Sequence, residues 1–298
     1  MIKVGAEAIA AKGWLAAHKW LIYRRIVQFG ILEAFLLGPL AGLWIVKGNL
    51  SYSLTLGVLP LTDPYVALQS LLTGHIPEKL GLIGVAIVLI FYFLVGGRAF
   101  CAWVCPINPI TDTAGWLRRR MNIKGGGAQF SRTTRYWILT MTLIVSVLSG
   151  SIAWEWINPV SMLHRGLFFG IGAAWMIVLA VFLLDVFVGK NLWCGRLCPV
   201  GAFYSLLGRH SPLRISASQR AACNDCMDCF EVCPEPQVIR PALKGAGITG
   251  PVIVGANCTN CGRCIDVCSK DVFNFGLRFN NPLENGKLVT SPTAAGNK

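Results

Sequence analysis

The stretch that decides the fold is Cys223-Asn-Asp-Cys226-Met-Asp-Cys229-Phe-Glu-Val-Cys233-Pro234. Its C-x2-C-x2-C-x3-C-P spacing returns in residues 258–268, where Ser269 replaces the proline. This spacing is typical of bacterial ferredoxins, in which three cysteines surround one iron–sulfur cluster and the fourth ligates the other cluster. We therefore expect an α+β ferredoxin-like domain with two [4Fe–4S] clusters. The expected ligands are Cys223, Cys226, Cys229 and Cys268 for cluster one, and Cys258, Cys261, Cys264 and Cys233 for cluster two.

Zinc is the competing metal for these cysteines. Two C-x2-C pairs can hold one zinc ion, but four cysteines in this rhythm, found twice, exceed what zinc needs. Disulfides are not expected, because we predict that this segment faces the reducing cytoplasm. The 24 residues 234–257 between the motifs are a longer insert than a minimal two-cluster ferredoxin has. The crossed ligation therefore requires this insert to loop out.

A second cysteine pattern, C-x3-C-P, occurs twice upstream and ends two apolar stretches, 93 residues apart. Its cysteines are Cys101, Cys105, Cys194 and Cys198. The i, i+4 spacing would place both sulfurs of a pair on one helix face, while the proline after each second cysteine indicates that the helix ends nearby. If the two repeats meet, the four thiolates would hold a third cluster or form a redox-active dithiol. A purely structural role is the other alternative.

The rest of the chain is strongly apolar. Of its 298 residues, 54% are hydrophobic and only 14% are charged, against roughly 25% charged residues in soluble domains. These numbers exclude disorder, collagen and coiled coil. A helix of about 20 apolar residues crosses a bilayer, and we expect an α-helical membrane protein with four transmembrane helices arranged as two two-helix repeats. The expected spans are 26–46, 80–97, 136–153 and 167–188.

Lysine and arginine predict the orientation of these spans, because cytoplasmic loops carry the positive excess. Five lie in the first 25 residues, seven in residues 98–135 and twelve after residue 188, but only three lie in the other two loops. We expect a multi-pass protein of the bacterial inner membrane with both termini in the cytoplasm. The net charge of +13 then reflects topology, which removes the argument for nucleic-acid binding.

In the first outer loop, Asp63 before Pro64 predicts an N-cap and a short helix to about Leu72 on the membrane surface.

The domain organisation follows from these patterns. The expected segments are a cytoplasmic N-terminal segment (1–25), repeat one (26–97), a cytoplasmic loop with the first C-x3-C-P pair (98–135), repeat two (136–188), a cytoplasmic segment with the second pair (189–215), the two-cluster domain (216–280) and a flexible tail (281–298).

The expected iron–sulfur clusters and cysteine pairs indicate that the protein transfers electrons. None of the four histidines lies in an expected span and no C-x-x-C-H occurs, so neither a bis-histidine haem nor a c-type haem is expected. A quinol is the natural donor, since it is lipid-soluble and gives two electrons while each cluster takes one. Its protons need acceptors, and a carboxylate within a span is a functional candidate. The candidate proton acceptors are Glu33, Asp185 and Glu155, although Asp185 could instead pair with Lys190 or cap a helix, and Glu155 could be an exposed interface residue.

Nearly the whole chain resembles the NapH family, the membrane quinol dehydrogenase components of periplasmic nitrate reductase systems. The resemblance rests on both cysteine patterns and on the stretches Pro60-Leu-Thr-Asp63-Pro, Cys105-Pro-Ile-Asn-Pro-Ile-Thr-Asp112, Gly115-Trp-Leu-Arg-Arg-Arg120, Trp154-Glu-Trp-Ile-Asn-Pro-Val160 and Cys226-Met-Asp-Cys-Phe-Glu-Val-Cys-Pro-Glu-Pro236. It implies a subunit that passes electrons from quinol to a periplasmic NapG-like polyferredoxin, and from there toward nitrate reductase.

Two other functions stay open. Proteins of the NosR or CcoG kind, which assemble or regulate a copper oxidase or reductase, share both cysteine patterns but usually carry an extra periplasmic domain. Only 30 residues follow Cys268 here, which counts against them. The other is a non-catalytic membrane anchor for a soluble ferredoxin partner. The sequence also leaves open which membrane face would oxidise quinol, because about 30 Å of hydrocarbon separates the two-cluster domain from the expected acceptor.

Overall fold

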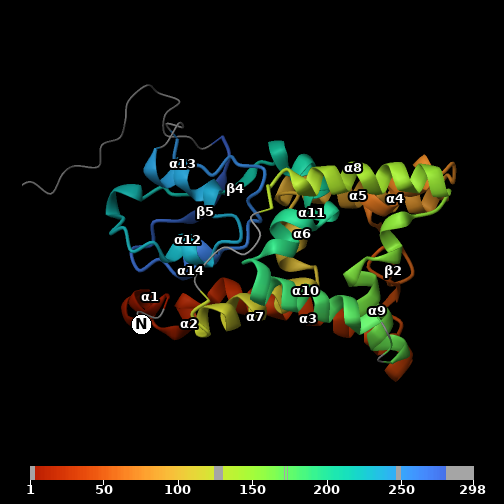
Figure 1. Cartoon of the computed structure of the whole chain (residues 1–298), viewed down its shortest axis with the longest axis horizontal. Coiled ribbons are helices and arrows are strands. Elements are labelled where there is room, and N and C mark those ends of the chain that lie inside the picture. The colour runs from red at the N-terminus through yellow and green to blue at the C-terminus, as the bar shows by residue number, and fades with distance from the viewer. Residues whose placement is uncertain (1–3, 124–129, 171, 173, 246–249, 280–298) are drawn as a thin grey trace, which may run out of the picture.

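The computed structural model describes residues 4–123, 130–170, 172, 174–245 and 250–279. They form an N-terminal helical half and a C-terminal half of short helices and strands, which lie side by side (Figure 1). The predicted flexible tail lies outside the described residues.

Helices dominate the N-terminal half. They are α1 (Ala6–Lys12), α2 (Trp14–Ala17), α3 (Lys19–Ala41), α4 (Pro64–Leu72), α5 (Lys79–Val95), α6 (Ala99–Trp103), α7 (Ile107–Arg120), α8 (Thr134–Ser149), α9 (Pro159–Phe169), α10 (Ala174–Leu183) and α11 (Pro199–Leu207). Shorter turns are η1 (Ala153–Trp156), η2 (Leu184–Val188), η3 (Trp193–Leu197) and η4 (Gly208–His210), of which η2 and η3 are π-helical. Helices α3, α7, α9 and α10 form one side of this half and α4, α5 and α8 the other, with α6 and α11 between them (Figure 1).

A small antiparallel sheet connects the two sides along the chain. Strands β1 (Val46–Gly48), β2 (Tyr52–Thr55) and β3 (Leu59–Thr62) pair in that order, and Ser53 of β2 lies opposite Leu61 of β3. The sheet follows α3 and leads into α4, so it positions the start of α4 beside the centre of the helical half.

The C-terminal half is built around β4 (Leu213–Ser216) and β5 (Asn274–Leu277), which pair antiparallel with Ile215 opposite Phe275. Its helical elements are η5 (Arg220–Ala222), α12 (Asp228–Val232), η6 (Pro236–Val238), α13 (Ile239–Lys244) and α14 (Arg263–Asp266). Buried apolar side chains pack in its core together with cysteines of both ferredoxin motifs. This half has the α+β composition expected of the two-cluster domain.

The prediction of four membrane spans is wrong. Among the described residues, no helix combines the length and the apolarity that crossing a bilayer requires. The second and third expected spans are α5 and α8, with 17 and 16 residues, and the fourth is divided among α9, α10 and η2. Helix α3 has 23 residues but contains Arg24, Arg25, Gln28 and Glu33. The inner-membrane location and the orientation of the termini were inferred from these spans and are corrected with them.

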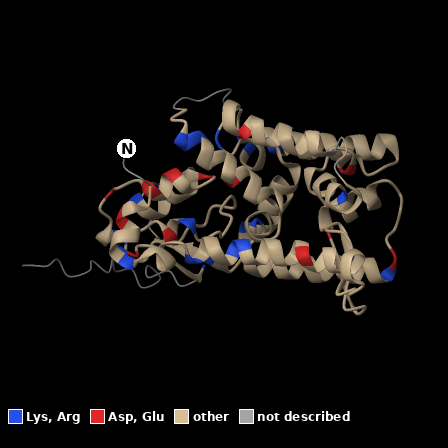
Figure 2. Cartoon of the chain, turned by 90° about the horizontal axis from the view of Figure 1, so that it is seen from below, with Lys and Arg blue, Asp and Glu red and all other residues tan. Residues whose placement is uncertain are grey.

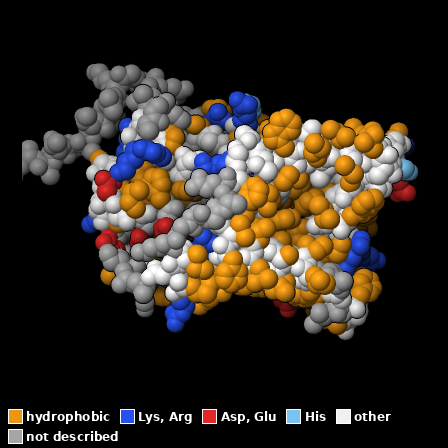
Figure 3. Space-filling model, in the orientation of Figure 1, with side chains coloured by type: hydrophobic (Ala, Val, Ile, Leu, Met, Phe, Trp, Pro, Cys, Tyr) orange, Lys and Arg blue, Asp and Glu red, His pale blue; other side chains and the backbone are white. Residues whose placement is uncertain are grey.

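Polar and apolar side chains are distributed unevenly. Charged residues gather in the C-terminal half and near its junction with the helices (Figure 2), whereas apolar side chains cover much of the helical half in the view of Figure 3. Inside the helical half, Arg24, Gln28, Gln69 and Ser146 are buried. The apolar runs that indicated spans therefore lie partly on the outside, and buried polar contacts hold the helices together.

Two helices of this half begin in the same way. The carboxylate of Asp63 accepts a hydrogen bond from the backbone N–H of Tyr65 at 3.0 Å, and the side chain of Asn158 accepts one from Val160 at 3.1 Å. Each cap is followed by proline at the first helical position, where a missing N–H has no cost. The predicted cap at Asp63 and the helix to Leu72 are confirmed.

Candidate iron–sulfur centres

The first predicted cysteine set lines one cavity of the C-terminal half. Cys223, Cys226, Cys229 and Cys268 surround a space of about 360 Å3, here called cavity I. Cys229 is buried and Cys226 is exposed, so cavity I lies close to the surface. Its fourth cysteine comes from the second motif, which is the arrangement that crossed ligation needs.

The second predicted set lines a cavity of similar size. Cys233, Cys258, Cys261 and Cys264 surround about 340 Å3, here called cavity II. Burial raises the pKa of the Cys258 thiol to about 11, so binding of a metal centre would have to displace its proton. These four cysteines are the set that the spacing predicts for one [4Fe–4S] cluster, whereas a single zinc ion would need all four sulfurs only about 2.3 Å from the metal.

Both motifs wrap their cavities with the same backbone conformation. Asp225 and Met227 flank the second cysteine of the first motif with φ of 59° and 65°. Asn260 and Gly262 occupy the equivalent positions of the second motif with φ of 46° and 73°. Left-handed residues on both sides of a cysteine turn the chain back on itself, which brings cysteines only three positions apart around one centre.

The insert between the motifs does more than loop out, which corrects that expectation. It forms η6 and α13, and Val238, Ile239, Ala242 and Leu243 pack in the core beside the cysteines. Residues 246–249 lie outside the part of the chain that the structure describes. The insert thus folds over the core while both cysteine sets stay together.

The two C-x3-C-P pairs meet at a third cavity. Cys101, Cys105, Cys194 and Cys198 all line one space of about 580 Å3, here called cavity III. Burial raises the pKa of the Cys198 thiol to about 12. Four thiols from two repeats fit a third [4Fe–4S] cluster, which would supply a further one-electron centre when bound.

The prolines end the helices of both pairs, as predicted. Helix α6 ends at Trp103, so Cys105 lies beyond it, and α7 begins after Pro106. Cys198 is the N-cap of α11, whose first residue is Pro199. Each pair therefore bends between two short helical elements, and this turns the pair toward the common cavity.

A buried ion-pair network joins cavity III to cavity II. The Glu235 carboxylate, two residues after Cys233, lies 2.7 Å from both Arg98 and Arg135. Arg98 also donates to the carbonyl oxygens of Cys194 and Asn257, each at 2.9 Å. Burial alone would raise the pKa of Glu235, but the two arginines outweigh it and hold that pKa below its usual value. The network fixes one C-x3-C-P pair against the second ferredoxin motif.

A direct contact links the other pair to the same motif. The indole N–H of Trp103, between Cys101 and Cys105, donates to the carbonyl oxygen of Asn260 at 3.0 Å. Cavities II and III are therefore neighbours along a short run of packed residues.

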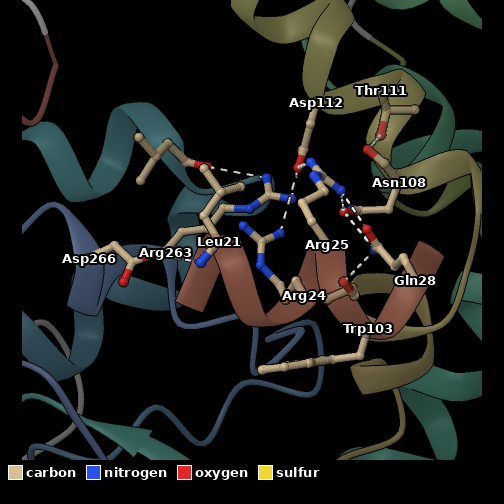
Figure 4. Close-up of polar contacts among 12 residues, drawn as sticks. Leu21, Arg24, Arg25, Gln28, Trp103, Asn108, Thr111, Asp112, Arg263 and Asp266 are labelled. Atoms are coloured by element: carbon tan, nitrogen blue, oxygen red, sulfur yellow. Dashed lines mark hydrogen bonds and ion pairs between the residues drawn. The ribbon is translucent and has the colours of Figure 1, made fainter. Parts of the chain in front are cut away.

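A second charged network ties α3, α7 and α14 together (Figure 4). The Asp112 carboxylate lies 2.5 Å from Arg25, 2.6 Å from Arg263 and 3.6 Å from Arg24. Arg263 stands between two cysteines of cavity II, and α14 also caps α3, because Asp266 accepts hydrogen bonds from the first turn of that helix. The helical half is thereby anchored to the second motif at another point.

The predicted proton acceptors have different positions. Glu33 is exposed on α3 and does not line cavity III. Asp185 is buried behind η3, where it accepts a hydrogen bond from the backbone N–H of Trp193 at 2.9 Å, and burial raises its pKa to about 7. Glu155 accepts hydrogen bonds from Ser51 at 3.1 Å and Asn158 at 3.0 Å, and both of these residues line cavity III.

Sequence reasoning missed Asp63 as a site residue. We interpreted Asp63 as a helix cap, which it is, but it also lines cavity III. The sequence did contain one indication of this role, because Asp63 belongs to the stretch Pro60-Leu-Thr-Asp63-Pro, on which the resemblance to the NapH family partly rests.

Comparisons with known proteins agree with this arrangement. A family model described as "4Fe-4S binding domain" matches residues 79–124 and 168–217, which include both C-x3-C-P pairs, and a "4Fe-4S dicluster domain" matches residues 222–272. No solved structure matches the chain.

Similarity to curated proteins extends over nearly the full length. The methylamine utilization ferredoxin-type protein MauN of Methylorubrum extorquens is 52% identical over 92% of this chain and 94% of its own. The ferredoxin-type proteins NapH of Escherichia coli and Haemophilus influenzae are 48% and 46% identical, each over 93% of this chain and 96% of their own.

Proposed function

The chain belongs to the family of ferredoxin-type proteins NapH and MauN, and we propose that it passes electrons from a quinol through three [4Fe–4S] centres to a separate polyferredoxin. The family relationship and the matching domains make it a ferredoxin-type electron-transfer protein with 4Fe-4S domains. The observation that carries the proposal is that all twelve cysteines lie, four at a time, around three cavities.

The contacts between the cavities support an order of transfer. Cavity III adjoins cavity II through Arg98 and Trp103, and cavities I and II share the two ferredoxin motifs. Cavity I has an exposed cysteine, Cys226. We propose that electrons arrive at cavity III, pass through cavity II and leave from cavity I.

Iron and sulfide analysis of anaerobically purified protein tests the three centres. We expect about twelve iron atoms per chain for three four-iron clusters, and about eight in both Cys101→Ser and Cys226→Ser. The two variants control for each other, since each removes one ligand but should abolish a different paramagnetic signal after reduction. Eight iron atoms in the parent, with no change in Cys101→Ser, would leave cavity III without a cluster.

The partner is a finer question with two candidates. The NapH relationship favours a NapG-like polyferredoxin that leads toward nitrate reductase, whereas the MauN match at 52% identity favours a chain that serves methylamine utilization. Mixing the reduced protein with each purified partner and following oxidation of its clusters distinguishes them. A quinol that reduces no cluster would instead favour the anchor or the accessory role for a copper enzyme.

A further inference from the structure

Cavity III is lined by more than its four cysteines. Its additional walls include Ser51, Asp63, Trp154 and Asn158, which come from the sheet region, η1 and two helix starts. A group bound at these walls would lie beside a cluster held by the cysteines.

These additional walls offer polar atoms in a mostly apolar setting. Asp63 uses Oδ1 to accept from the Tyr65 backbone at 3.0 Å and the Tyr204 hydroxyl at 3.2 Å, and no described residue donates a hydrogen bond to Oδ2. Trp154 is 1% exposed, and its indole Nε1 has no hydrogen-bond partner among the described residues. Buried polar atoms are normally paired, so this wall is suited to a ligand that both donates and accepts.

A second carboxylate lies directly behind the wall. The Ser51 hydroxyl donates to Glu155 at 3.1 Å, and the Ser51 carbonyl oxygen accepts from the backbone N–H of Asp63 at 2.8 Å. Ser51 and Asp63 are therefore adjacent, and the Ser51 hydroxyl can accept a proton from the cavity while it gives its own to Glu155.

We propose that this end of cavity III binds the ring of a para-hydroquinone, with Asp63 as the acceptor of one hydroxyl proton and with Ser51 passing the other to Glu155. The inference rests on the proposed function, in which a quinol is the donor. Two O–H bonds of the ring break, one O–H bond forms at each carboxylate, and the two electrons go singly to two oxidised iron–sulfur clusters. Asp63 touches the substrate, whereas Glu155 acts through Ser51 and is a positioning residue.

The ionisation of Asp63 supports this role. Burial and, to a smaller extent, the charge of Glu155 raise its pKa to about 6, against the opposing effect of the hydrogen bonds from Tyr65 and Tyr204. The charge of Asp63 in turn raises the pKa of three tyrosines packed around it, Tyr65, Tyr92 and Tyr204. At pH 7 the carboxylate is largely ionised, and a base with a pKa near the working pH accepts protons efficiently.

The test is the rate at which duroquinol reduces the oxidised holoprotein, followed by bleaching of the cluster absorbance in a stopped-flow instrument. Asp63→Asn keeps the helix cap, because asparagine caps as well as aspartate, and removes the base. We expect a loss of at least about 100-fold at pH 7, the lower range for a general base. In the parent, the rate should fall tenfold per pH unit below about pH 6, and Asp63→Asn should lack this limb.

Three measurements keep the outcomes separate. Iron content and reduction by dithionite should be unchanged in Asp63→Asn, titration with duroquinone should still show binding, and Glu78→Gln, an exposed carboxyl at the start of α5, should behave as the parent. Ser51→Ala should slow reduction and shift the pH profile without changing iron content. If duroquinol reduces the parent and Asp63→Asn equally fast, the inference is overturned and the proposed function stands. If dithionite reduces the parent but duroquinol does not, the proposed quinol donor fails as well.

Discussion

Replacing Glu235 by glutamine should destabilise the junction between the two halves severely. Glu235, Arg98 and Arg135 are 2%, 1% and 0% exposed, and the variant leaves both arginines without their counter-charge. Removing one partner of a buried ion pair costs about 3–5 kcal/mol. With a guanidinium dependence of about 5 kcal/mol per molar, the upper range for small proteins, the unfolding midpoint should fall by roughly 0.6–1 M.

The assay is anaerobic unfolding in guanidinium chloride after a fixed incubation, monitored by circular dichroism and by cluster absorbance. Asp271→Asn is the control, because its carboxyl is 69% exposed and its ion pair with Lys12 is of the surface type worth about 0–1 kcal/mol. The arginines hold the pKa of Glu235 below its ordinary value of 4.5, so the stabilisation is present above that pH and is lost in acid. The difference between Glu235→Gln and the parent should therefore shrink as the pH falls below about 4.5. A midpoint shift no larger than that of Asp271→Asn would refute the reasoning.

Two further predictions concern packing and a buried acid. Gly97→Ala should destabilise the protein by about 1–3 kcal/mol, because a Cβ there would lie 1.8 Å from the backbone oxygen of Tyr204. Gly30→Ala should instead stabilise the protein by about 0.5–1 kcal/mol, because Gly30 has open space around it in α3. Thermal unfolding of both variants tests these opposite effects on stability. Burial raises the pKa of Asp185 to about 7 from 3.8, so the parent should lose stability as the pH rises through this interval, by up to about 1.4 kcal/mol per unit. Asp185→Asn should lack this loss in denaturant titrations between pH 4 and pH 8, and parallel curves for the two proteins would contradict it.

The cysteine sets could be anticipated from the sequence because ligation imposes spacing. A ferredoxin motif sends its fourth cysteine to the neighbouring cluster, and the structure brings Cys233 and Cys268 to the cavities that this rule assigns. The meeting of Cys101 with Cys194 was considered only as a condition, with a third cluster, a redox-active dithiol and a structural role left open as alternatives. Internal repetition indicates an interface but does not specify the chemistry there.

The arrangement of the helices could not be anticipated in the same way. Hydropathy counts apolar residues along the chain, and it cannot register that Pro39 and Gly42 accompany the end of α3 or that η2 interrupts the fourth apolar stretch. The ion pairs at the junction between the two halves could not be predicted for a different reason. Arg98 and Glu235 are 137 positions apart, and no local pattern pairs them.

The buried networks next to the cysteine-lined cavities hold more arginines than carboxylates. Two buried arginines share Glu235 between cavities II and III, and three arginines share Asp112 next to cavity II. Burial and the neighbouring charge of Arg263 together lower the pKa of Arg24 to about 10, and its Nε and Nη1 have no hydrogen-bond partner among the described residues. Uncompensated buried cations are strongly destabilising. In the proposed function, a cage of four thiolates would add negative charge beside each network, and this charge would increase when the centre accepts an electron, so the arginine excess would stabilise both the assembled centre and its reduced state. At cavity I, by contrast, the ion pair of Asp225 and Lys244 is exposed.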